Sequence, residues 1–124
     1  IDLDNFKSVN DTYGHDVGDE VLRHFYKKAK NVLRQNDQLG RFGGEEWLLV
    51  MPGSNTQHIE QIFNRIRTAV VKTAIKGLPE SYQLTFSLGV TQWDGHSQWD
   101  DTLKRADDAV YNAKQSGRDR WELL

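Results

Sequence analysis

The residues with the clearest chemical potential are the run Gly43-Gly44-Glu45-Glu46-Trp47, in which two glycines precede two carboxylates. A Gly-Gly pair between two apolar segments predicts a two-residue hairpin turn joining strands at residues 38–42 and 45–51, because glycine adopts positive φ without steric cost. A turn without side chains lets a ligand approach its backbone, and successive residues of the next strand point to opposite faces. Taken alone, the pattern is that of an ordinary hairpin. Beside other binding residues, it predicts a turn whose acids hold metal and phosphate.

Four further motifs accompany this turn along the chain. They are Ile1-Asp2-Leu3-Asp4-Asn5-Phe6-Lys7, Asn10-Asp11-Thr12-Tyr13-Gly14-His15, Gly18-Asp19 and Leu103-Lys104-Arg105-Ala106-Asp107. In this order and at this spacing, and together with residues 43–47, they resemble the GGDEF family of diguanylate cyclases over essentially the whole chain. The family's hairpin motif has Asp or Glu at its third position and Phe at its fifth, where this chain has Trp47. A large apolar side chain there is expected to pack in the core.

The composition is that of one small domain. The chain has 124 residues, no cysteine and a formal net charge of −2. The absence of cysteine excludes disulfides and thiolate metal sites, and the charge argues against a broad basic surface for nucleic acid. No apolar run approaches membrane-spanning length and no signal peptide opens the sequence. We therefore expect a cytoplasmic domain, with membrane anchoring of the full-length protein left open.

The hydrophobic patterns predict alternating helices and strands. Ile1-Asp2-Leu3 reads as the end of a strand, and the family usually has a helix and the start of that strand before this point. We therefore expect a single domain over residues 1–124 that lacks both. Asp16 is a candidate N-cap for a helix with an apolar face from Val21 to Leu33, and Ser54 with Gln57 forms a candidate capping box for a second helix.

The C-terminal half predicts three more elements. Residues 82–90 alternate apolar and polar side chains, which indicates a half-buried strand. A last helix carries apolar residues from Leu103 to Ala113, with Gly117 as a plausible C-cap, and residues 120–124 could form a closing edge strand. This order indicates an α+β fold in which helices flank a largely antiparallel sheet. The resemblance implies the nucleotidyl cyclase or polymerase-palm version of that fold.

The resemblance also places the end of the first strand beside the hairpin turn, which would bring Asp2 near Glu45. Two adjacent carboxylates repel each other and favour a bound cation, and Mg²⁺ prefers such oxygen ligands. The family's metal ligands correspond to Asp2, Glu45 and the backbone carbonyl of Leu3, with Mn²⁺ as an alternative ion. Its catalytic positions correspond to Glu45 and Glu46, and for Glu46 a structural role and a role as base both remain open.

The implied reaction condenses two GTP molecules into cyclic di-GMP and releases two pyrophosphates. Because one domain would hold one GTP, the resemblance implies a homodimer, with an upstream sensory or receiver domain as a further partner and no nucleic acid. A carboxylate and an amide can together form hydrogen bonds with the edge of guanine, although Asn and Asp often only cap helices and turns. The family's substrate-binding positions correspond to Asn5, Phe6, Lys7, Asn10, His15, Asp19, Gly43, Gly44 and Lys104.

Arg34 and Asp37 match the family's RxxD motif, an inhibitory site for the product cyclic di-GMP. The guanidinium of arginine suits phosphate or a guanine edge, whereas the plain alternative is a surface Arg–Asp pair. This motif also supports the competing hypothesis, a non-catalytic domain that acts as a receptor or interaction module for cyclic di-GMP or GTP. Retention of Asp2, Glu45 and Glu46 favours the cyclase.

Overall fold

The computed structural model describes residues 1–124 and contains one five-stranded sheet of order β2-β3-β1-β4-β5. All neighbouring strands are antiparallel except β4 and β5, which are parallel. The α+β prediction with a largely antiparallel sheet is therefore confirmed, as is the closing strand at the sheet edge. In chain order the elements are β1 (Asp2–Leu3), α1 (Phe6–Tyr13), α2 (His15–Val32), β2 (Gln38–Gly43), β3 (Glu46–Val50), the 3-10 helix η1 (Thr56–His58), α3 (Ile59–Val71), β4 (Phe86–Val90), α4 (Trp99–Gln115) and β5 (Arg120–Leu123).

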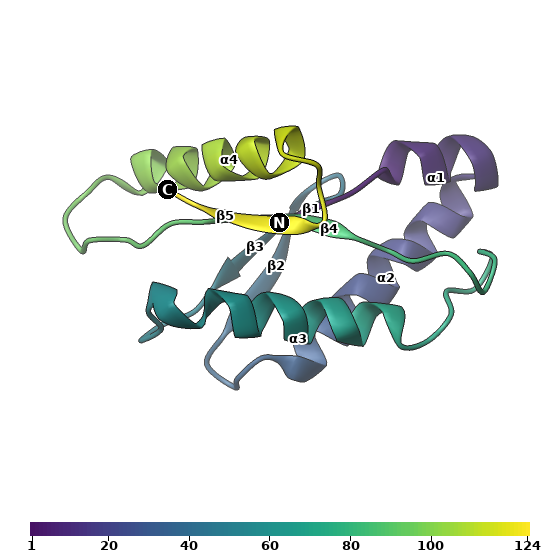
Figure 1. Cartoon of the computed structure of the whole chain (residues 1–124), viewed down its shortest axis with the longest axis horizontal. Helices are drawn as coiled ribbons and strands as arrows, with labels where there is room; N and C mark the ends of the chain where they lie inside the picture. The colour runs from purple at the N-terminus through teal and green to yellow at the C-terminus, as the bar shows by residue number, and fades with distance from the viewer.

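Helices cover both faces of the sheet. Helix α4 lies on one face, α2 and α3 lie on the other, and α1 stands at the end where the first strand leaves the sheet (Figure 1). None of these helices combines the length and the apolar character needed to cross a membrane.

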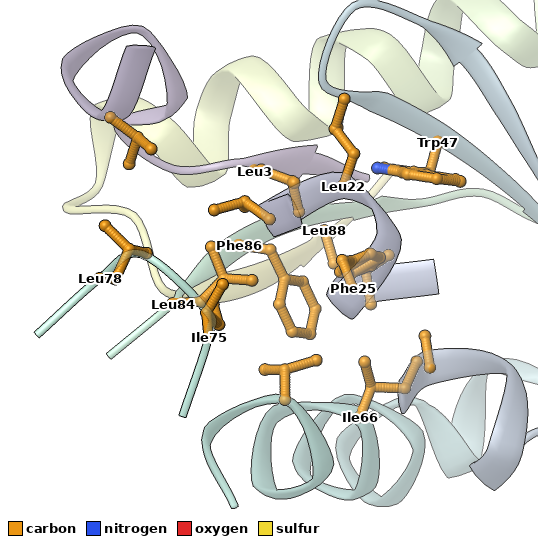
Figure 2. Packing of buried hydrophobic residues seen from close by; sticks show 14 of the residues in the cluster. Leu3, Leu22, Phe25, Trp47, Ile66, Ile75, Leu78, Leu84, Phe86 and Leu88 are labelled. Carbon is orange, nitrogen blue, oxygen red and sulfur yellow. The ribbon is translucent and has the colours of Figure 1, made fainter. Parts of the chain in front are cut away.

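The hydrophobic core fills the space between the sheet and the pair α2 and α3. Phe86 is fully buried at its centre, with its ring 5.5 Å from Phe25 of α2 and 5.1 Å from Phe63 of α3. Figure 2 shows Phe25, Phe86 and Ile66 gathered in this layer, with Leu3 close by. Because Leu3 points into the core, the residues on either side of it in the chain must point to the α4 face.

On the face that α4 covers, β4 carries small residues. Ser87 is buried there, and Gly89, two residues further along β4, lies directly under α4. A Cβ atom on Gly89 would lie 2.2 Å from the backbone oxygen of Ala106 and 2.5 Å from the backbone nitrogen of Val110. A glycine at this position therefore lets α4 approach the sheet closely enough to deliver its own side chains to the strand ends.

Several predicted boundaries are wrong by a few residues. The residue before α2 is Gly14, and Asp16 lies within the first turn of the helix instead of capping it. Before η1 the capping side chain is Asn55, whose Oδ1 accepts the Gln57 N–H at 2.9 Å. Ser54 instead receives a hydrogen bond from Arg34, so the expected capping box does not form.

Two other differences concern strands and turns. The strand predicted over 82–90 begins only at Phe86. The hairpin turn consists of Gly44 and Glu45, because Gly43 still pairs with Glu46 and a register shift between Arg41 and Gly43 takes up one residue. The last helix ends with Ser116 as its C-cap, and Gly117 follows at φ +122.

Candidate functional site

Asp2 lies opposite Glu46 on β3 and opposite Ser87 on β4. Trp47 and Ile1 exchange backbone hydrogen bonds on one side of the Asp2–Glu46 pair, and the Leu3 N–H donates to the Glu45 carbonyl on the other. The Asp2–Glu46 pair is thus the closely spaced, non-hydrogen-bonded kind, in which the two side chains share a face. That face is the one covered by α4.

Glu45 occupies the hairpin turn beside Leu3. Gly44 has φ +51, a conformation that favours glycine, and the Arg41 Nε donates to its carbonyl at 2.8 Å. The Leu3 N–H donates to the Glu45 carbonyl at 3.2 Å. Since the N–H and C=O of one strand residue point to the same side, the Leu3 carbonyl faces this turn as well. The structure therefore brings together Asp2, Leu3 and Glu45, the three residues expected to hold a metal.

Lys114 of α4 reaches the same carboxylate. Its Nζ lies 2.7 Å from Asp2 Oδ2, while Asp2 Oδ1 is buried and has no hydrogen-bond partner. Burial raises the pKa of Asp2, Lys114 opposes that rise, and the nearby Glu45 adds to it. Lys114 was not among the residues predicted for the site.

Glu46 sits in a field of negative charge. Burial raises its pKa, and the charges of Asp2, Asp107 and Glu45 raise it further, against the opposing charge of Lys114. Asp107 of α4 belongs to a motif noted in the sequence, but it was not assigned to the site. A carboxylate with a raised pKa can accept a proton closer to neutral pH than an ordinary glutamate.

The donors at this site fit a hard divalent cation. Asp2 offers a buried oxygen without a partner, and Glu45 and the Leu3 carbonyl supply further oxygen atoms. No group of three or more His, Cys, Asp or Glu side chains is arranged to hold a metal, so a cation at this site would also need ligands other than side chains. Two carboxylates with a carbonyl suit Mg²⁺ or Mn²⁺, which take their remaining ligands from water and substrate phosphates.

The predicted guanine-binding residues come from two adjacent helices. Asn10 of α1 packs against Gly18 of α2, where an added Cβ would lie 1.9 Å from Asn10 Oδ1. Asp19 follows Gly18 and is exposed, and His15 is exposed at the first position of α2. Asn10, His15 and Asp19 therefore gather around the junction of the two helices, with Asn10 held by close packing against a glycine.

The predicted phosphate-binding backbone lies at the start of α1. Asn5 has φ +58 and precedes the helix, Phe6 begins it, and Lys7 is exposed on its first turn. The first N–H groups of a helix have no partners within it and favour an anion. Lys104, the other predicted phosphate ligand, is exposed on α4 and pairs with Asp108 at 3.1 Å.

Asp4 is a buried carboxylate that serves the fold. It accepts hydrogen bonds from Ser87 Oγ at 2.7 Å, Thr85 Oγ1 at 2.8 Å and the Asp119 N–H at 3.0 Å. These bonds join β1, β4 and the loop before β5. Asp4 therefore fixes the strand end that carries Asp2 and Leu3.

Arg34 and Asp37 contact each other at the connection between α2 and β2. The Asp37 carboxylate accepts the Arg34 backbone N–H at 2.8 Å and the guanidinium Nη2 at 2.9 Å. Burial would raise the pKa of Asp37, but these hydrogen bonds and the Arg34 charge outweigh it and lower the pKa. The Asp37 side chain is fully buried, whereas that of Arg34 is 52% exposed. The guanidinium is the part of this motif that a ligand can reach.

Trp47 packs in the core, as predicted. It is 6% exposed, and its ring lies 5.4 Å from that of Phe25 and 5.8 Å from that of Tyr26. Its indole Nε1 is buried without a partner. The larger ring therefore fits behind the turn, on the sheet face opposite Glu46.

A groove of about 880 Å³ separates β3 from β4. Strand β1 pairs with β3 only at Asp2 and with β4 only at Asp2 and Leu3, so beyond this point no strand lies between them. Asp2 and Glu46 border the groove, and its walls are largely apolar. They include Leu48, Val50, Ile59, Ile62, Leu88, Val90, Leu103 and Val110. A smaller hollow of about 370 Å³ beside α1 touches only Asn5 among the predicted substrate residues.

Comparison with known proteins gives consistent matches. Residues 1–120 match the family model described as "Diguanylate cyclase, GGDEF domain". The chain is 41% identical over 120 residues to the diguanylate cyclase DgcM of Escherichia coli strain K12. This alignment covers 97% of the chain and 28% of DgcM. The chain thus spans less than a third of the length of this curated relative.

Solved structures of related proteins share the fold, among them those of SiaD and DgcB. The diguanylate cyclase SiaD from Pseudomonas aeruginosa, solved with its activator SiaC, superposes with a TM-score of 0.92 at 40% identity. That match covers 99% of this chain and 47% of SiaD. The GGDEF domain of DgcB from Caulobacter crescentus, solved with cyclic di-GMP, gives a TM-score of 0.88 at 28% identity, covering 98% of this chain and 73% of DgcB.

Proposed function

The chain belongs to the GGDEF family of diguanylate cyclases, and from this membership we propose that it condenses two GTP molecules into cyclic di-GMP and releases two pyrophosphates. The observation that carries the proposal is the arrangement at the strand end. Asp2 has a buried, unpartnered oxygen, stands opposite Glu46 and lies beside Leu3 and Glu45. Such a set of oxygen atoms suits a divalent cation on a triphosphate.

The reaction joins each 3′-oxygen to the α-phosphorus of the other nucleotide and breaks the bond between that phosphorus and the pyrophosphate oxygen. Asp2, Glu45 and the Leu3 carbonyl would hold Mg²⁺ or Mn²⁺, which when bound lowers the pKa of the attacking hydroxyl and offsets charge on the phosphates. Glu45 and Glu46 are the candidate acceptors of the hydroxyl proton. The raised pKa of Glu46 suits that task, because a good general base has a pKa near the working pH.

The remaining predicted residues would position the nucleotide. We assign the guanine edge to Asn10 and Asp19, with His15 shaping the same turn, and the phosphates to the N-terminus of α1 at Asn5, Phe6 and Lys7. The hairpin at Gly43 and Gly44 leaves room for the substrate, because a Cβ on either glycine would meet no atom within 4 Å. We retain Lys104 as a phosphate ligand that would have to leave its ion pair with Asp108.

Catalysis in this proposal needs two copies of the domain, because each supplies one GTP and the product is two-fold symmetric. Holding the two nucleotides face to face would supply much of the rate, which makes dimerisation a natural control point. An upstream sensory or receiver domain would set the distance between the two copies. The activator in the SiaD structure is an instance of a partner on a related enzyme.

Product binding at Arg34 and Asp37 is proposed as feedback inhibition. Arg34 exposes part of its guanidinium, and the buried Asp37 holds that group in place through its hydrogen bonds. The structure of the related DgcB domain contains cyclic di-GMP, which supports binding of this ligand by the fold.

We also propose that an extended apolar segment continuous with Ile1 completes β1 inside the groove between β3 and β4. The facing edges of these strands have no partner there, and buried backbone groups normally find one. A strand in this position would be hydrogen-bonded on both sides and would cover the apolar walls.

The test of the proposed function is incubation of the intact protein with GTP and Mg²⁺, with the products identified by mass spectrometry. Cyclic di-GMP from the parent protein and its loss in Glu45→Gln would support the proposal, with Glu80→Gln as an exposed control. A folded protein that makes no product yet binds cyclic di-GMP would favour the receptor function instead.

A further inference from the structure

Lys114 is the only basic side chain that forms an ion pair with an acid of the proposed metal site. Its ammonium lies 2.7 Å from Asp2 Oδ2, and the two side chains are 30% and 12% exposed. The other Asp2 oxygen is buried and unpartnered. A positive charge thus already sits on the carboxylate that the divalent cation would use.

The helix beneath Lys114 is firmly placed. Ala109 and Ala113 are fully buried, and α4 rests directly on Gly89. The Lys114 side chain, by contrast, is a flexible four-carbon stem with a compact charge and rotatable donors. The ammonium can therefore leave Asp2 without moving the helix.

We propose that Lys114 is a resident counter-ion, which neutralises Asp2 in the nucleotide-free protein and must leave it when a divalent cation binds. This inference rests on the proposed function, since it assumes that Asp2 is a metal ligand. An ammonium on Oδ2 and a divalent cation on Oδ1 of the same carboxylate would repel each other at contact distance, so the two ions compete for Asp2. Lys114 is in this account a positioning residue: it keeps a buried charge paired until the cation arrives.

The competition predicts tighter metal binding when the lysine charge is removed. Binding of Mn²⁺ alone would be followed by the loss of its free electron paramagnetic resonance signal in the intact protein, Lys114→Met and the control Lys27→Met. Lys27 is an exposed residue of α2 without an ion pair. We expect at least about fivefold tighter binding in Lys114→Met, because this partly buried pair should be worth no less than the upper range for an exposed pair, and no change in Lys27→Met. When Asp2 is replaced, the lysine substitution should no longer tighten Mn²⁺ binding, so Asp2→Asn/Lys114→Met should bind Mn²⁺ no more tightly than Asp2→Asn.

A second readout needs no substitution and decides the matter if Lys114→Met does not fold. Acetylation of Lys114 by a soluble ester, followed by peptide mass spectrometry, should become at least about twofold faster in saturating Mg²⁺, while Lys27 stays constant. An unchanged rate at Lys114, or unchanged or weaker Mn²⁺ binding by a folded Lys114→Met, would overturn the proposal. If the folded parent protein neither binds Mn²⁺ alone nor forms cyclic di-GMP from GTP, the metal site itself fails, and the proposed function fails with it.

Discussion

Asp2 and Glu46 face each other directly across neighbouring antiparallel strands, on the sheet face that α4 covers. The pairing places two carboxylates side by side, and Glu45 in the adjoining turn and Asp107 on α4 add to the negative charge. These negative charges repel one another when no cation is bound, so they favour binding of a cation. The register of the β1–β3 pair thus places Asp2 of the first strand beside Glu45 and Glu46 of the hairpin.

Glu46→Gln should stabilise the metal-free protein at about pH 7.5. The folded state raises the pKa of Glu46 above its ordinary value of 4.5, so the charged form opposes folding at neutral pH and the penalty disappears once the pH falls below that value. The gain should stay below about 1 kcal/mol, because Glu46 is largely exposed. Urea unfolding in EDTA at several pH values measures it, with Glu80→Gln as control. A gain that grows on acidification would refute this account.

Gly18→Ala should weaken GTP binding. The new methyl group would lie 1.9 Å from Asn10 Oδ1 and 3.3 Å from the Phe6 ring, so Asn10 must move from its place. We expect a KM for GTP higher by roughly tenfold, the cost of about one lost hydrogen bond to the base. Gly40→Ala is the matched control, since a Cβ there meets no atom within 4 Å. If Asn10 reads guanine, Asn10→Ala and Asn10→Ala/Gly18→Ala should have the same KM. Unchanged KM in Gly18→Ala would remove Asn10 from the site.

Arg34→Ala should relieve inhibition by cyclic di-GMP. Loss of a charge-assisted contact should raise the inhibition constant by about tenfold or more. Arg23→Ala offers a control, because Arg23 is also an exposed arginine of this region with a carboxylate partner, Glu20. Inhibition curves with added product provide the measurement. Equal inhibition of Arg34→Ala and the parent protein would place the inhibitory site elsewhere.

Extension of the chain at Ile1 by a short segment of alternating valine and threonine should raise the free energy of unfolding by at least about 2 kcal/mol, through burial of apolar groove surface. The same extension should also remove a dependence of the free energy of unfolding on pH. Burial lowers the pKa of the free Ile1 amino group from 8.0 to about 6, so the unextended chain should lose stability as the pH falls from about 8 to 6. Thermal unfolding at both pH values tests this. An extension of equal length with a central proline, which cannot donate to the sheet, should stabilise less. No difference between the two extensions would count against a strand in the groove.

The periodic parts of the sequence predicted the fold well. The apolar positions of α2 and α3 and the closing strand appear where their patterns placed them, and the two hairpin strands lie within one residue of their predicted bounds, because burial of one face determines these elements. Helix α1 was not predicted: it has only one buried residue, Val9, and its start is fixed by Asn5 in a left-handed conformation. A short helix held by its ends leaves little periodic signal.

The site was predicted less completely than the fold. The meeting of Asp2 with the hairpin came from family resemblance, and the pairing of Asp2 with Glu46 depends on strand register that no local pattern reveals. Lys114 escaped notice because its role follows from how closely α4 packs on Gly89, a tertiary contact. The turn itself lies one residue later than predicted, since the register shift between Arg41 and Gly43 is not encoded by the two glycines alone.

The most direct test of the proposed cyclase is to measure pyrophosphate and cyclic di-GMP in the same reaction of the intact protein with GTP and Mg²⁺. The account predicts about two pyrophosphates for each cyclic di-GMP, and a loss of both products by at least roughly a hundredfold in Glu45→Gln. A folded, dimeric protein that releases neither product, or Glu45→Gln that retains the parent rate, would contradict the assignment of this strand end as a catalytic centre.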